Sequence, residues 1–276
     1  MANDFISVSE IDSGFDCEHT LAISLRSCES PKEFFSLAAK HGPTNDLDSP
    51  SSVRHRQSIA IARKPAHPHV LVGTSGWSYP SWKPGFYPAD LKPREFLSFY
   101  AERFATVELN TTGYRLPAEE QFERWAAQVP DGFRFAVKFQ AYRPEQAGTF
   151  EERVRALGDR LGPIRVVLQS ARDEGMLTLL LGSLDPELQL AFDLRHDSWE
   201  GIEPVLAAAG AVRVDSLDPD APFHYLRLRE PPYSESELGE WAGRIRSLRA
   251  PTFVYFRHED EPTAPRYAAR LAELLD

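Results

Sequence analysis

The sequence predicts an α/β protein: a TIM-type (β/α)8 barrel preceded by a largely disordered N-terminal extension. From residue 69 onward, short apolar strand patterns alternate with longer amphipathic helix patterns. Strict alternation places helical crossovers between parallel strands, and eight strands in about 200 residues suit a closed barrel. A doubly wound open sheet is the alternative. Closure is favoured because no strand carries the marks of an exposed sheet edge.

Each expected strand is a short run rich in Val, Ile, Leu and Phe, and each expected helix repeats apolar residues at three- and four-residue spacing. The strands are expected over residues 69–75, 106–110, 134–140, 164–170, 188–195, 211–216, 224–230 and 251–259. The helices are expected over residues 91–104, 119–128, 149–162, 174–184, 202–210, 234–249 and 264–275. The connection between the sixth and seventh strands is a short loop without a long helix.

Residues 1–68 differ from the remainder of the chain. They are rich in Ser, Asp and Asn and show little periodicity, apart from one possible short helix over residues 31–42. Such a composition buries too little apolar surface to offset the entropy of ordering. We therefore predict two regions, a disordered or weakly structured extension over 1–68 and a barrel domain over 69–276.

The composition excludes several classes of protein. The chain has 276 residues, of which 42% are hydrophobic and 26% charged, so it is neither wholly disordered nor collagen-like. The formal net charge is −10, whereas proteins that bind duplex nucleic acid usually carry an excess of basic residues. The two cysteines, Cys17 and Cys28, match no zinc-binding spacing. With no apolar run of membrane-spanning length and no visible signal peptide, we expect a cytoplasmic protein that does not bind membranes.

Alternation along the strands predicts which side chains enter the barrel. Where the apolar positions face the helices, the intervening residues face the lumen. The polar residues so placed are Glu108, Asn110, Lys138, Gln140, Asp193, Arg195, Arg213, Asp215, Tyr225, Arg227, Arg229, Tyr255 and Arg257. Most lie near the C-terminal ends of their strands, where barrels of this type hold their active sites. Cations outnumber carboxylates in this set, which indicates an anionic ligand; a purely structural ion-pair network is the alternative.

The densest motif is GTSGWSYPSWKPGFYP at residues 73–88. Gly73 and Gly76 allow tight backbone after the first strand. The five aromatic rings of this segment can form either a small core under a long loop or a wall on which a ligand stacks.

This motif belongs to a series that resembles the YecE-like proteins, also called domain of unknown function 72. The others are FYAERFATVELNTTGYRLP (99–117), WAAQVPDGFRFAVK (125–138), LGDRLGPIRVVLQ (157–169), FDLRHDSW (192–199), YLRLREPPYSESELGEWAGRI (225–245) and VYFRHEDEPTAPRYAARL (254–271). The resemblance runs from about residue 70 to the end of the chain. It implies a TIM-type barrel and no established activity. The residues carried over by the resemblance are Trp77, Asn110, Tyr114, Lys138, Gln169, Asp193, Arg195, His196 and Trp199.

The leading hypothesis is an enzyme acting on a phosphate- or carboxylate-bearing substrate at the C-terminal mouth of the barrel. The expected catalytic residues are Lys138, Asp193, His196 and Glu108. The expected substrate-binding residues are Trp77, Asn110, Tyr114, Gln169, Arg195, Trp199, Arg227 and Arg257. Lys138 would stabilise negative charge or act as a base, and a carboxylate would be its acid–base partner.

The competing hypothesis is a non-catalytic module that binds single-stranded nucleic acid on a platform of aromatic rings: Trp77, Tyr79, Trp82 and Trp199. We expect no cofactor. A divalent metal is a minor alternative, because lumen-facing histidines are scarce. The oligomeric state cannot be predicted from the sequence.

Overall fold

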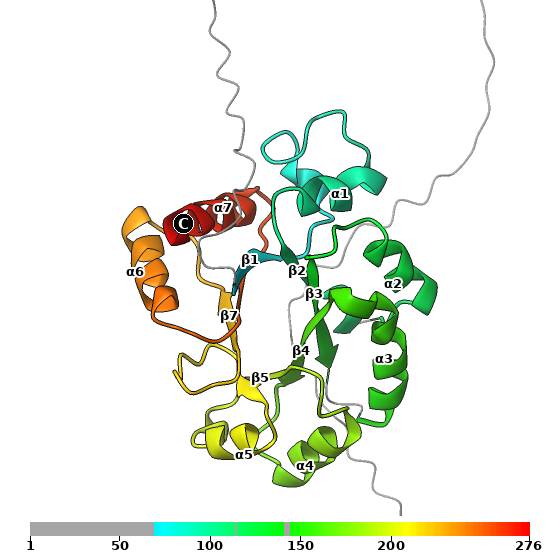
Figure 1. Ribbon diagram of the computed structural model, residues 1–276, viewed down its shortest axis with the longest axis vertical. Coiled ribbons are helices and arrows are strands. Elements are labelled where there is room, and N and C mark those ends of the chain that lie inside the picture. The colour runs from blue at the N-terminus through cyan, green and yellow to red at the C-terminus, as the bar shows by residue number, and fades with distance from the viewer. Residues whose placement is uncertain (1–68, 114, 141–143) are drawn as a thin grey trace, which may run out of the picture. The chain divides into compact units, whose positions relative to one another are not determined.

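The computed structural model describes residues 69–113, 115–140 and 144–276 (Figure 1). The strands are β1 (Val70–Ser75), β2 (Thr106–Leu109), β3 (Arg134–Gln140), β4 (Leu161–Leu168), β5 (Leu190–Leu194), β6 (Val212–Arg213), β7 (His224–Leu228) and β8 (Thr252–Phe256). The helices are α1 (Phe96–Ala101), α2 (Glu119–Ala126), α3 (Ala147–Val154), α4 (Glu174–Ser183), α5 (Glu203–Ala208), α6 (Glu235–Arg246) and α7 (Thr263–Leu275). The expected extension over 1–68 lies outside the described residues.

The eight strands form one parallel sheet in the order β6-β5-β4-β3-β2-β1-β8-β7. Figure 1 looks along the barrel, with the strands around the centre and the helices outside them. Each crossover returns the chain to the start of the next parallel strand, as expected for βα units. The prediction of a TIM-type barrel is confirmed, and the barrel is nearly closed.

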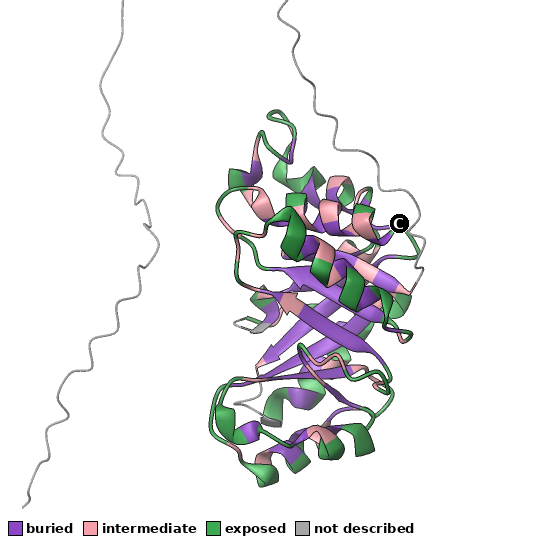
Figure 2. Ribbon diagram, turned by 90° about the vertical axis from the view of Figure 1, so that its left-hand side faces the viewer, coloured by how far each residue is buried: buried purple, intermediate pink, exposed green. Residues whose placement is uncertain are grey.

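Two apolar cores hold the barrel together. The larger lies between the outer faces of the strands and the helices. The smaller fills part of the lumen, and among its members are Ala136, Ala191, Val212, Tyr225 and Phe253. The strands are buried along almost their whole length, whereas the helices alternate buried and exposed faces (Figure 2). Polar side chains from the C-terminal halves of the strands therefore lie directly above an apolar plug.

Asp215 joins the two ends of the sheet. In the described chain no ladder pair connects β6 to β7, but the Asp215 backbone N–H donates to the Tyr225 carbonyl at 2.9 Å. The Asp215 carboxylate accepts a hydrogen bond from the Arg227 backbone N–H at 2.6 Å and another from the Arg229 guanidinium. Asp215 has φ +68°, a left-handed conformation that Asp tolerates better than most residues. This junction between β6 and β7, which we call the seam, is thus held by the backbone N–H and the carboxylate of Asp215 in place of a regular ladder.

The register predicted for the sixth strand is wrong. Val212 and Val214 pack into the lumen core, and Arg213 instead points outward and forms an ion pair with Glu203 of α5 at 2.7 Å. In this short strand the lumen takes the apolar side chains, so the rule that apolar positions face the helices does not hold. Asp215 follows the strand, and its positive φ turns its side chain towards β7.

The third helix is shorter than predicted and the fourth strand begins earlier. Helix α3 ends at Val154 and is followed by 3-10 turns over Arg155–Arg160. Gly158 has φ +54° and ψ −135°, which interrupts any helical path. The chain then enters β4 at Leu161, three residues before the expected start.

Gly73 permits the close approach of β1 to the backbone at the start of β2. A Cβ atom at this position would lie 2.1 Å from the Thr106 carbonyl oxygen. The hydroxyl of Tyr100 fills the remaining space, accepting from Thr74 N at 2.9 Å and donating to Thr106 O at 3.1 Å. Close packing of β1 against β2 therefore requires glycine at position 73, the first residue of the aromatic motif.

We predict that Asp215→Gly lowers the free energy of unfolding by about 1–3 kcal/mol, because it removes acceptors at the seam while allowing the positive φ. Asp215→Asn retains an oxygen for the Arg227 N–H and should cost less. Urea unfolding measures both. The matched control is Asp90→Gly in an exposed loop. Equal stability of Asp215→Gly and the control would contradict the role given to this seam.

Candidate functional site

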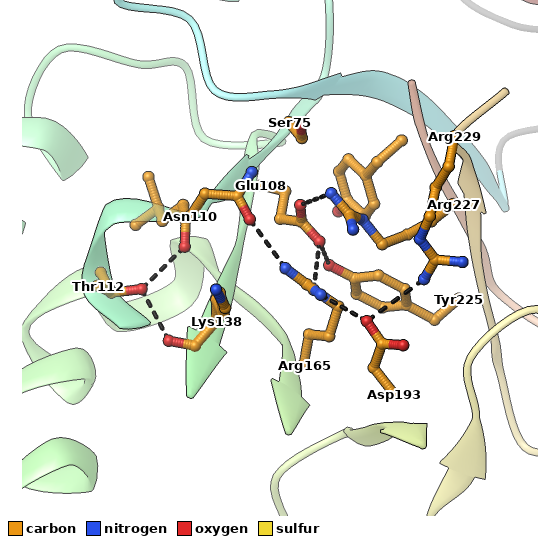
Figure 3. Close-up of polar contacts among 12 residues, drawn as sticks. Ser75, Glu108, Asn110, Thr112, Lys138, Arg165, Asp193, Tyr225, Arg227 and Arg229 are labelled. Carbon is orange, nitrogen blue, oxygen red and sulfur yellow. Dashed lines mark hydrogen bonds and ion pairs between the residues drawn. The ribbon is translucent and has the colours of Figure 1, made fainter. Parts of the chain in front are cut away.

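Arg165 links two buried carboxylates at the centre of the lumen (Figure 3). Its Nε lies 2.7 Å from Glu108 Oε1, and its Nη1 lies 2.6 Å from Asp193 Oδ2. Its Nη2 donates to Asn110 Oδ1 at 2.8 Å. Glu108 comes from β2, Arg165 from β4 and Asp193 from β5, so one guanidinium connects three strands. Glu108 is fully buried and Arg165 only 2% exposed.

Each of the two carboxylates is also contacted by further arginines. Glu108 accepts a hydrogen bond from Tyr225 OH at 2.6 Å, and its Oε2 lies 2.9 Å from Arg227 Nη2. Asp193 receives both Nε and Nη2 of Arg195, at 2.7 and 2.9 Å, and lies 3.3 Å from Arg229 Nη2. We call this set the ionic cluster: Glu108, Lys138, Arg165, Asp193, Arg195, Asp215, Arg227 and Arg229. It contains five cations and three carboxylates.

The arginines keep the buried carboxylates ionised. Burial alone would raise the pKa of Glu108, but Arg165 and Arg227 outweigh it, so that its pKa is lowered. Burial likewise opposes ionisation of Asp193, and Arg165, Arg229 and Arg195 lower its pKa. These two groups therefore act as fixed negative charges at neutral pH.

Lys138 belongs to the same layer of the barrel. It lies in register with Arg165 on the neighbouring strand and is 8% exposed. Its burial and the nearby Arg165 lower its pKa, against the opposing effect of Glu108. A lysine whose pKa is lowered in this way is better able to accept a proton near neutral pH.

An aromatic cleft opens beside the ionic cluster. This mouth cleft has a volume of about 450 Å³ and is lined by Trp77, Tyr79, Glu108, Asn110 and Trp125, among others. The Trp77 and Trp125 rings meet edge to face at 5.4 Å. Glu108 and Asn110 belong both to the cleft lining and to the hydrogen-bonded network around Arg165. A ligand in the cleft would therefore lie next to the charged groups.

The aromatic motif divides between core and cleft. Trp82 and Tyr87 are fully buried, and Trp82 Nε1 donates to the Glu259 carbonyl at 3.1 Å. Trp77 and Tyr79 are only partly buried and line the cleft. The small-core alternative therefore holds for Trp82 and Tyr87, while Trp77 and Tyr79 lie where the ligand-stacking alternative requires them.

The remaining expected site residues are distributed more widely. Arg257 and Gln169 are exposed just beyond β8 and β4. His196 is exposed, and its Nδ1 lies 2.9 Å from Ser198 Oγ at the start of a 3-10 turn. Trp199 is fully buried and donates to the Ser170 carbonyl at 2.9 Å. Tyr114 lies outside the described residues.

Burial of Trp199 and Trp82 removes two of the four rings expected to form a nucleic-acid platform. The geometry does not support that platform in the form the sequence suggested.

Sequence reasoning missed Arg165, the most connected member of the cluster. Residues 164–168 of β4 are Ile, Arg, Val, Val and Leu, so both faces of the strand are apolar near its C-terminal end. The signal was nonetheless present, because Ile164, Val166 and Leu168 share one face and leave Arg165 on the other. Asn110, Lys138, Asp193, Arg195 and Arg227 are brought together as their alternation suggested.

Within residues 69–113, 115–140 and 144–276, no group of three or more His, Cys, Asp and Glu side chains is arranged to hold a metal ion. Over the same residues, no helix is both long and apolar enough to cross a bilayer.

Fold and site together define a (β/α)8-barrel protein with a charged lumen and an aromatic cleft at its C-terminal mouth. The chain belongs to the DUF72 family, described as "Protein of unknown function DUF72", which matches residues 71–276.

Individual relatives agree with this assignment. Over 143 residues the chain is 32% identical to UPF0759 protein YecE of Escherichia coli K12, covering 47% of this chain and 50% of the relative. It thus spans about half the length of the curated relatives it matches. A DUF72 family protein from Thermotoga maritima MSB8 is similar in structure, with TM-score 0.65 and 24% identity over 75% of this chain and 98% of that chain. Another from Enterococcus faecalis V583 has TM-score 0.61 and 16% identity over 75% and 97%. These structures show a shared fold.

We predict that Arg165→Met lowers the free energy of unfolding by about 3–5 kcal/mol at neutral pH, because it leaves two buried carboxylates short of positive charge. In the wild type, the lowered pKa values of Glu108 and Asp193 stabilise the fold above about pH 4–5 and cease to do so as pH falls through them. In the variant, both pKa values should be higher than in the wild type because the Arg165 charge is gone, so ionisation of the two carboxylates stabilises the fold less as pH rises.

The stability gap between wild type and Arg165→Met should therefore widen from pH 4 to pH 7 in urea unfolding. A Glu108→Gln/Arg165→Met double variant should recover part of the loss, because one buried charge is gone. Arg155→Met, on the surface, is the control. A gap that stays constant with pH would show that Arg165 acts by packing alone.

Proposed function

We propose that the protein is an enzyme acting on a phosphate- or carboxylate-bearing substrate at the C-terminal mouth of the barrel. The observation that carries the proposal is the excess of cations in the ionic cluster, on a chain whose formal charge is −10. Collecting like charges in a buried place costs stability. An anionic ligand offsets that cost and explains why the cations are there.

Arginines near the mouth can offer donors to such a ligand. The Arg229 side chain is 24% exposed, and its Nε has no hydrogen-bond partner within the described residues. Arg195 is 41% exposed and Arg257 is exposed, so both can reach an anion from the solvent side. Guanidinium groups bind phosphate and carboxylate through paired hydrogen bonds. We assign anion binding to Arg195, Arg229 and Arg257.

Lys138 is the proposed proton-transfer group. It is buried beside the cluster, and its lowered pKa suits a base or a group that stabilises developing negative charge. Glu108 and Asp193 have lowered pKa values and hold arginines, so we assign them to positioning and to charge balance. The mouth cleft would hold the body of the substrate against Trp77 and Tyr79.

We predict that phosphate, sulfate or citrate stabilises the wild type at constant ionic strength. A ligand at about 100 times its Kd adds about 2.7 kcal/mol, which in a domain of this size raises Tm by several degrees. Arg195→Gln/Arg257→Gln should lose most of the shift, since both side chains reach the solvent at the mouth. Asp193 loses its contacts with Arg195 in this variant but keeps those with Arg165 and Arg229. Differential scanning calorimetry measures the shift.

Arg270→Gln, on helix α7, controls for loss of one surface charge. If no anion shifts the wild type more than the double variant, the anion site is absent and the ionic cluster is a structural network.

A further inference from the structure

A second hollow with three arginines adjoins the mouth cleft. This outer groove has a volume of about 700 Å³ and is formed by residues 115–118, helix α2 and Arg153. It shares Thr111, Gln121 and Trp125 with the mouth cleft. The two hollows therefore meet at the Trp125 ring, which contributes to the lining of both.

The outer groove is positively charged. Arg115, Arg124 and Arg153 line it, and among the described residues its lining contains no Asp or Glu. In the part of the chain that the structure describes, none of the three forms an ion pair with a carboxylate. Most other arginines of the described chain do have carboxylate partners, including Arg155 and Arg160 close by in sequence. Cations grouped around one concave surface attract an anion.

Two of these arginines are held in position by neutral groups. Arg153 Nη1 donates to the carbonyls of Leu116 and Pro117, each at 3.3 Å. Arg124 Nη2 donates to Gln121 Oε1 at 2.7 Å. These contacts orient the guanidinium groups without neutralising them, and within the described residues the other guanidinium N–H groups of Arg124 and Arg153 make no hydrogen bond. Orientation before binding reduces the entropy lost when the ligand binds.

We infer that the outer groove is a second anion subsite, and that the ligand is elongated, with one anionic group at the ionic cluster and another at Arg115, Arg124 and Arg153. This inference rests on the proposed function, which supplies the first anion site. Between the two ends the ligand crosses Trp125, whose flat ring suits contact with a planar or apolar middle portion. The substrate class is thus a molecule or chain that carries at least two separated phosphate or carboxylate groups.

Inorganic pyrophosphate probes the two subsites independently. In isothermal titration calorimetry at constant ionic strength, the wild type should bind pyrophosphate at two sites. Arg124→Gln/Arg153→Gln should retain only the site at the ionic cluster, and Arg195→Gln/Arg257→Gln should retain only the outer site. Arg270→Gln should bind as the wild type does. Tryptophan fluorescence should report the outer site through Trp125.

Linear polyphosphates of increasing length test whether one ligand spans both subsites. Affinity should rise at least about tenfold once the chain reaches from one to the other, because the second contact becomes intramolecular. Either double variant should abolish that rise, while Arg270→Gln keeps it.

The outcomes separate the subsite from the proposed function. A single wild-type site that disappears in Arg195→Gln/Arg257→Gln would overturn the outer subsite and leave the proposed function standing. A single site that disappears only in Arg124→Gln/Arg153→Gln would overturn the proposed function and the elongated ligand. If the wild type has two sites but its affinity does not rise with polyphosphate length, the inference that one elongated ligand spans both sites is overturned.

Discussion

The bridge from Arg165 to Glu108 and Asp193 is the interaction on which the upper half of the barrel depends. One guanidinium, 2% exposed, joins carboxylates from β2 and β5 across the lumen. Removing either kind of partner would leave a buried charge only partly compensated, which costs more than a missing surface ion pair. Because Glu108 and Asp193 are held in this way, they in turn hold Arg227, Arg195 and Arg229.

This arrangement divides the lumen into two functional layers. Below, Tyr225, Phe253 and small residues such as Ala136 and Ala191 form a buried apolar plug. Above, the ionic cluster lies in a setting where charges interact more strongly than they would in bulk water. A lysine in that setting has a lowered pKa, and surplus arginines meet the solvent at the mouth. The side chains of the ionic cluster thus both stabilise the fold and carry the proposed chemistry.

Much of this could be predicted from the sequence, because most strands have one clearly apolar face. Alternation correctly placed Glu108, Lys138, Asp193 and Arg227 in the lumen. It failed for Arg213, since the short β6 directs its valines inward to fill the barrel. Arg165 was overlooked because Val167, which shares its face, is apolar and weakens the alternation at the end of that strand. Alternation along one strand shows on which side a charge lies, but not its partner on another strand.

The aromatic motif shows a second limit of the same kind. Trp77, Tyr79, Trp82 and Tyr87 are alike in the sequence, and only the fold separates those in the core from those in the cleft. Trp82 packs against Phe86 and Tyr87, and its buried indole N–H donates to the carbonyl of Glu259, 177 residues further along the chain. Likewise, the outer groove combines α2 with Arg153, a juxtaposition created by the packing of neighbouring helices.

The most direct measurement is an NMR titration of the side-chain carboxyl carbons of Glu108 and Asp193 in uniformly ¹³C-labelled protein. If Arg165 holds both groups as the fixed charges of the cluster, each carboxyl should titrate below its ordinary value of about 4.3 for Glu and about 3.9 for Asp. Assignment is checked with Glu108→Gln, which removes one of the two signals. A pKa above the ordinary value for either carboxyl would mean that burial outweighs the arginines, and would contradict the account of the ionic cluster.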